Sequence, residues 1–154
     1  MPGADYLYIT GVADPGTGAA DTFFFARDEL EALVADGGLR NAQVWFEHGD
    51  QWKTNMGEVA YAWVEPRQGL KVVIRIDRSQ LCAASLFEWV KDGIFRGLSL
   101  GYTAALDPVT FKATGKTVQE ISVVKHPFHP SCVIDGVFEQ CDGRTHFFRR
   151  HGVR

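Results

Sequence analysis

The chain has 154 residues, of which 45% are hydrophobic and 23% charged, and its formal net charge is −3. This length and balance predict a single soluble globular domain. The small negative charge offers no broad basic field for nucleic acid, and no apolar run approaches the length of a membrane span. The three cysteines, at positions 82, 132 and 141, are odd in number and irregularly spaced, which favours a reducing compartment over a disulfide framework.

Hydrophobic periodicity divides the chain into short strands and two helices. Alternation with a period of two predicts the strands, and apolar residues at helical spacing followed by glycine predict the helices. In chain order, the expected elements are a strand at 6–12, a short strand or buried segment at 22–25, a helix at 27–35, a strand at 43–47, a hairpin of strands at 57–65 and 70–76, a helix at 79–92, and strands at 94–102, 117–125 and 133–138.

Six or seven short strands with only two helices indicate a mainly β protein of the α+β class. We expect a small closed or strongly bent antiparallel β-barrel with flanking helices. Residues 1–143 are expected to form the domain. Residues 144–154 are basic and aromatic without periodicity, and we expect them to be a flexible tail or linker.

One predicted strand holds a serine between glycines, since residues 97–101 read Gly-Leu-Ser-Leu-Gly. Glycines at both ends let other backbone approach closely or let the strand bend. A small hydroxyl presented in this way is either a tight packing contact or a nucleophile, and a nucleophilic serine needs a base within hydrogen-bond reach. His48 is the first candidate base, because it lies where the strand at 43–47 ends and a turn begins.

A second group of side chains offers a different chemistry. His126, His129 and Cys132 follow one another at spacings of three, and with His48 they make four nitrogen and sulfur ligands of the kind that zinc takes. This spacing is not a common zinc signature, and the intervening prolines scatter the side chains. A zinc-binding protein and a non-catalytic, partner-binding β-barrel are the alternatives to an enzyme.

Four segments occur in an informative order along the chain. They are Tyr-Ile-Thr-Gly-Val at 8–12, His-Gly-Asp at 48–50 with Met-Gly-Glu-Val at 56–59 and Gly-Leu at 69–70, Gly-Leu-Ser-Leu at 97–100 behind a helix, and Gln-Glu-Ile-Ser-Val-Val at 119–124. This order resembles that of herpesvirus assemblin-type capsid maturation proteases and of phage prohead proteases, which share their fold. The resemblance runs from about residue 6 to residue 134. It implies an assemblin-like fold and a serine endopeptidase that needs no cofactor or metal.

The resemblance also implies a catalytic triad in the order histidine, serine, third group. Ser99 becomes the nucleophile and His48 the general base. Glu120 takes the place of the third group, where mammalian herpesviruses have a second histidine and the phage-type enzymes look built with a carboxylate. Its role would be to accept the proton-bearing nitrogen of the base and to stabilise the imidazolium.

Two parts of this implied mechanism stay open at the level of sequence. His126 and His129 are alternative third members, because the prolines beside them let the chain fold back. The family places an arginine-bearing loop beside the developing oxyanion, whereas residues 125–129 contain no arginine. Lys125 or a backbone amide of this stretch is left for that role.

The family's activity implies the partners. The substrates would be scaffolding protein, capsid precursor and the chain's own linkers inside an immature capsid, with a small residue such as alanine before the cut. Assemblin-type enzymes work as homodimers, so a homodimer is expected here. The location would be the host nucleus for a herpesvirus-like source and the bacterial cytoplasm for a phage. Neither nucleic acid nor a membrane is expected as a partner.

Overall fold

The structure is a computed structural model that describes residues 6–18, 24–49, 54–77, 83–141 and 144–149. Strands dominate this part of the chain, together with two helices and one short 3-10 turn. The elements are β1 (Tyr6–Asp14), α1 (Arg27–Ala35), β2 (Gln43–Phe46), the 3-10 turn η1 (Glu47–Gly49), β3 (Gly57–Glu65), β4 (Gly69–Asp77), α2 (Ala83–Lys91), β5 (Gly97–Leu106), β6 (Ala113–Val124), β7 (Ile134–Cys141) and β8 (Arg144–Arg149).

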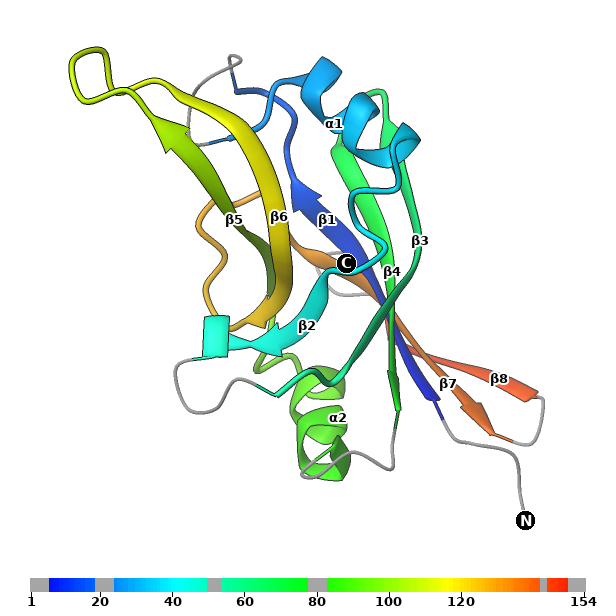
Figure 1. The fold of residues 1–154 in the computed structure, drawn as a ribbon. Coiled ribbons are helices and arrows are strands. Elements are labelled where there is room, and N and C mark those ends of the chain that lie inside the picture. Colours follow the sequence, from blue (N-terminus) through cyan, green and yellow to red (C-terminus); the bar gives the residue numbers. More distant parts are fainter. Residues whose placement is uncertain (1–5, 19–23, 50–53, 78–82, 142–143, 150–154) are drawn as a thin grey trace.

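The strands form two sheets that lie beside each other, with β5 of one near β1 of the other (Figure 1). The larger sheet has the order β3-β4-β1-β7-β8 and is antiparallel throughout. The smaller sheet has the order β2-β6-β5, and β2 runs parallel to β6. The mainly β class with two helices is as expected. The sheets of the described residues are not closed into a barrel, and the parallel β2–β6 pair departs from the antiparallel arrangement that was expected.

The hydrophobic core lies between the two sheets and takes alternate residues from each strand. Leu7 and Ile9 of β1 are fully buried, and so are Leu98 of β5 and Ile121 and Val123 of β6. Burying one such side chain contributes about 1.5–3 kcal/mol relative to leaving it in water. The core therefore fixes the position of β5 and β6, the strands that carry Ser99 and Glu120.

Several local predictions are confirmed, and that of α1 is confirmed to the residue. Helix α1 spans Arg27–Ala35 as expected, with the backbone amide of Ala26 donating to Oε1 of Glu29 at its start. Strands β3 and β4 form the expected hairpin, in which Glu65 pairs with Gly69. Helix α2 ends within one residue of its predicted end, whereas residues 79–82 of the predicted helix lie outside the described residues.

The C-terminal segment differs from the prediction. Residues Arg144–Arg149 form β8, which pairs antiparallel with β7, so this part of the expected tail is a strand at the edge of the larger sheet. Residues 150–154 lie outside the described residues.

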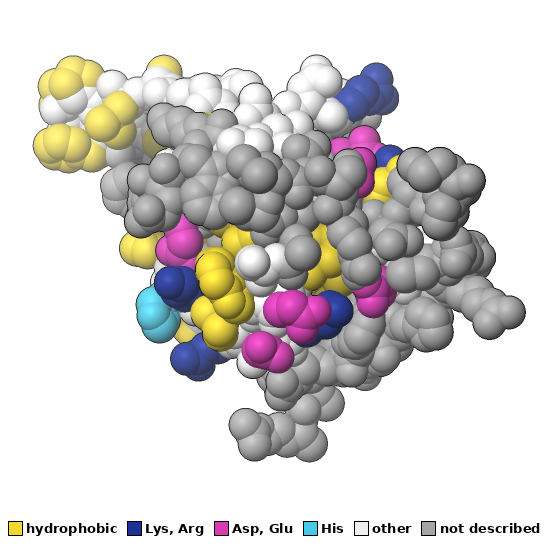
Figure 2. Space-filling view, turned by 90° about the horizontal axis from the view of Figure 1, so that it is seen from below, with side chains coloured by type: hydrophobic (Ala, Val, Ile, Leu, Met, Phe, Trp, Pro, Cys, Tyr) yellow, Lys and Arg dark blue, Asp and Glu magenta, His cyan; other side chains and the backbone are white. Residues whose placement is uncertain are grey.

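Two surface properties bear on partners. Neither helix in the described part has the length and apolar content needed to cross a membrane. On the face shown in Figure 2, acidic, basic and hydrophobic side chains are interspersed, and the described part of this face shows no field of a single sign.

Candidate active site

A strained turn positions His48 at the site. The backbone of Glu47, His48 and Gly49 has φ values of 53°, 55° and 76°, which lie in the left-handed region. This conformation costs a non-glycine residue about 1–2 kcal/mol. Two hydrogen bonds hold the turn against β6 and the residue that follows it. The amide of His48 donates to Oγ of Ser122 in β6 (3.1 Å), and the amide of Lys125 donates to Oε1 of Glu47 (2.5 Å). Strain that is held in this way is common at functional sites.

The imidazole of His48 contacts a buried carboxylate. Its Nδ1 lies 2.6 Å from Oε1 of Glu120, whose residue is only 4% exposed, while the His48 side chain is 44% exposed. A carboxylate only accepts hydrogen bonds, so this contact assigns a proton to Nδ1, and in the neutral ring the acceptor is then Nε2. The hydroxyl of Ser122 donates to the other oxygen, Oε2. Both oxygens of Glu120 are therefore fixed, and the ring presents the nitrogen that a general base needs.

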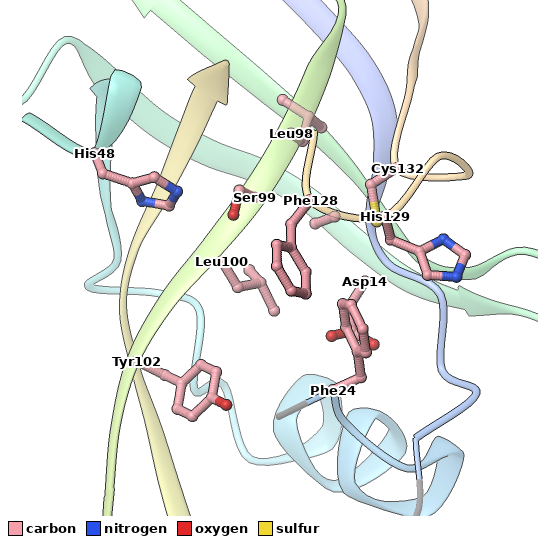
Figure 3. A pocket seen from close by; sticks show the side chains of 11 residues that line it. Asp14, Phe24, His48, Leu98, Ser99, Leu100, Tyr102, Phe128, His129 and Cys132 are labelled. Carbon is pink, nitrogen blue, oxygen red and sulfur yellow. The ribbon is translucent and has the colours of Figure 1, made fainter. Parts of the chain in front are cut away.

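Ser99 lies on β5, which pairs with β6, and it lines the same pocket as His48. In the β5–β6 register, Ser99 is opposite Ser122 and Gly101 is opposite Glu120. Figure 3 shows the imidazole of His48 beside the Ser99 hydroxyl, at one side of a pocket of about 270 Å³. No hydrogen bond joins this hydroxyl to another residue that the structure describes; such bonds often tighten only when substrate binds.

Gly97 and Gly101, the glycines on either side of Ser99, are each required for a different steric reason. A Cβ on Gly97 would lie 2.5 Å from Cβ of Pro127 and 2.6 Å from the carbonyl oxygen of Cys132, in the loop that follows β6. A Cβ on Gly101 would overlap the carboxylate of Glu120. The first glycine lets the loop approach the pocket, and the second leaves room for the group that holds His48.

The two alternative third members lie elsewhere. His126 is exposed and does not line the pocket. His129 lines the pocket, but its Nδ1 accepts hydrogen bonds from the amide (3.1 Å) and the hydroxyl (2.7 Å) of Ser131, and its ring packs edge-on against Phe24. Of the three candidates, Glu120 is the one in contact with His48.

The zinc alternative finds no support in the geometry. Within the described residues, no three side chains of histidine, cysteine, aspartate or glutamate gather as a metal site would require. Cys132 is buried, and burial, together with the charge of Asp14, raises the pKa of its thiol to about 12. A thiol held in its neutral form is a poor metal ligand.

Lys125 does not reach the pocket. Its backbone amide is bonded to Glu47, and its ammonium group lies over the ring of Phe95, 5.9 Å from the centroid. The residues of this loop that do line the pocket are Phe128, His129 and Cys132. Lys125 is therefore not placed to stabilise an oxyanion at Ser99.

The sequence interpretation missed three residues of the site. Ser122 contacts both Glu120 and the backbone of His48, and its spacing of two from Glu120 on one strand was a signal that it would share the same face. Glu47 fixes the turn, and Asp14 lines the far side of the pocket. Neither was identified from the sequence, because the contact of Glu47 with Lys125 and the shared pocket of Asp14 and Ser99 join segments that are distant in the chain.

No protein-family model matches this chain, and no curated protein is significantly similar to it. Its function has to be inferred from the site.

Proposed function

We propose that this chain is a serine endopeptidase in which Ser99 is the nucleophile, His48 the general base and Glu120 the group that orients the base. The observation that carries the proposal is the 2.6 Å contact between Nδ1 of His48 and Oε1 of Glu120, with Ser99 on the same pocket. His48 would take the hydroxyl proton as Oγ attacks the scissile carbonyl, and would then return it to the leaving amine. Glu120 would stabilise the imidazolium between these steps.

We further propose that the enzyme is a capsid maturation protease of the assemblin or prohead type, with the strongly bent β architecture of that class. The colinear motifs support this assignment. The glycines of residues 97–101 clear space for the loop after β6 and for Glu120, and Glu120 contacts His48. Its substrates would be scaffolding protein, capsid precursor and its own linkers inside an immature capsid. It would work as a homodimer, in the host nucleus for a herpesvirus-like source or the bacterial cytoplasm for a phage.

Cleavage of a peptide library tests the proposed activity. Peptides prepared from a digested proteome are incubated with the protein, and new termini are identified by mass spectrometry. We expect one consistent set of cleavage sites that disappears with Ser99→Ala. Ser131→Ala is the matched control, because Ser131 is an exposed serine that also bonds a histidine but does not line the pocket. Cleavage that survives Ser99→Ala would refute the assignment, as would a folded protein that cleaves nothing.

A further inference from the structure

The pocket beside Ser99 has a buried carboxylate on its opposite side. Asp14 is the last residue of β1, is only 4% exposed, and lines the pocket together with Ser99. In Figure 3, Asp14 lies across the pocket from His48 and Ser99, with Leu100 and Phe128 between them. The pocket therefore has a nucleophile at one side and an acidic group at the other.

The hydrogen bonds of Asp14 leave part of its carboxylate unused. Oδ1 accepts from the amide of Gly16 (2.9 Å) and Oδ2 from the amide of Phe25 (3.3 Å). A carboxylate has about four acceptor positions, and no side chain among the described residues donates to this one. The charge of Lys116 acts on Asp14, but the hydrogen bonds of that ammonium go to Glu29 and to the carbonyl of Phe24.

The environment of Asp14 favours the arrival of a positive charge. Burial raises the pKa of its carboxyl, and the two amide bonds and the charge of Lys116 only partly oppose this. A cation bonded to the free acceptor positions would offset the loss of water around the carboxylate. The Tyr102 side chain also lines the pocket, but it carries no positive charge that would compete with an incoming cation for Asp14.

The walls between the two ends are apolar. They come from Leu98 and Leu100 of β5 and from Phe24 and Phe128, whose ring centroids lie 5.5 Å apart. A space of about 270 Å³ admits one amino-acid side chain rather than a longer ligand. A side chain that fits this pocket has an apolar stem and a polar end.

We propose that this pocket receives the side chain of the residue that contributes the scissile carbonyl, and that it selects lysine or arginine. The stem packs against Leu100 and Phe128, and the cationic end donates to Asp14. This inference rests on the proposed serine endopeptidase and names its substrate class. It differs from the small residue that the resemblance to assemblin-type enzymes implies.

Phosphonate reagents test the selection without a known substrate. Three aminoalkyl diphenyl phosphonates are compared that differ only in their side chain: that of lysine, of norleucine, which has the same stem without the charge, and of alanine. The rate of modification of Ser99 is followed by mass spectrometry. We expect the lysine reagent to react at least about tenfold faster than the norleucine reagent, and the ratio of the two rates to fall to about one in Asp14→Asn.

A second measurement uses the unaltered protein, in case Asp14→Asn fails to fold. n-Butylamine is expected to slow modification by the norleucine reagent, whereas n-butanol, of similar size, is not. Equal effects of amine and alcohol, or equal rates for the lysine and norleucine reagents, would overturn the proposed selection. If a general fluorophosphonate still modifies Ser99 in that case, the endopeptidase proposal stands and only the specificity fails. If no reagent modifies Ser99 in the folded protein, both proposals fail.

Discussion

Gly101 on β5 faces Glu120 on β6 so closely that the Glu120 carboxylate occupies the space where a Cβ of residue 101 would lie. Oε1 of the same carboxylate contacts Nδ1 of His48. The absence of a side chain at position 101 is therefore a condition for the contact that orients the proposed base. Gly101 therefore has a role in the site, although it is not proposed to touch substrate.

Replacing Gly101 with alanine tests this relationship. The added methyl group forces the Glu120 carboxylate away from His48, because the two cannot share the space. We expect a loss of about 1–3 kcal/mol in the free energy of unfolding, as in other overpacked sites, and a fall of about 10²-fold in kcat. Ala105→Val, at an exposed position of the same strand, is the control and should leave both unchanged. Full activity of Gly101→Ala would mean that Glu120 is dispensable.

Replacing Glu120 with glutamine separates the candidates for the third group. The amide keeps the shape but no longer stabilises a charged imidazolium, so kcat should fall by about 10³–10⁴-fold. His126→Ala should retain full activity, because His126 is exposed and lies off the pocket. A silent Glu120→Gln, combined with inactivity of His126→Ala or His129→Ala, would show that a histidine is the third member.

Replacing Ser122 with alanine removes two hydrogen bonds at once, the one to Oε2 of Glu120 and the one from the amide of His48. Because Ser122 is fully buried, the free energy of unfolding should fall by about 1–3 kcal/mol. As a positioning residue, it should affect kcat, by up to about 10²-fold, with little change in KM. Ser131→Ala is the exposed control. A loss of stability with an unchanged kcat would leave Ser122 a purely structural role.

Cys132 provides a prediction on pH. The pKa of its thiol is about 12 in the folded chain, against an ordinary value of 9.0. Between these values the unfolded chain has lost the proton while the folded chain keeps it, so the free energy of unfolding falls as pH rises through this window. Urea unfolding of the wild type and of Cys132→Ala should show a smaller decline in the variant. Identical declines, or alkylation of Cys132 in the native protein as fast as in denaturant, would contradict the burial of the thiol.

Elements defined by a local hydrophobic pattern could be predicted from the sequence. The bounds of α1 follow from leucine spacing and its glycine stop, and the β3–β4 hairpin follows from two alternating runs around a turn. The parallel pairing of β2 with β6 was not predicted, because backbone pairing between distant segments leaves little local trace. The strand β8 was not predicted, because residues 144–149 lack hydrophobic alternation.

The candidate site was predictable to a similar degree. Ser99, His48 and Glu120 came from motifs in a specific order, but their meeting in space depends on the register of β5 and β6 and on the left-handed turn at His48. Asp14 could not be connected to Ser99 from the sequence. Eighty-five positions separate them, and only the packing of β1 against β5 brings them to one pocket.

Modification by a fluorophosphonate is the most direct measurement of the central claim, that His48 and Glu120 activate Ser99. The intact protein is incubated with the reagent, and the modified residue is located by mass spectrometry. We predict one adduct, on Ser99, that is absent in Ser99→Ala and forms much more slowly in His48→Gln. An unmodified Ser99 in folded protein, or a rate that does not change in His48→Gln, would contradict the account.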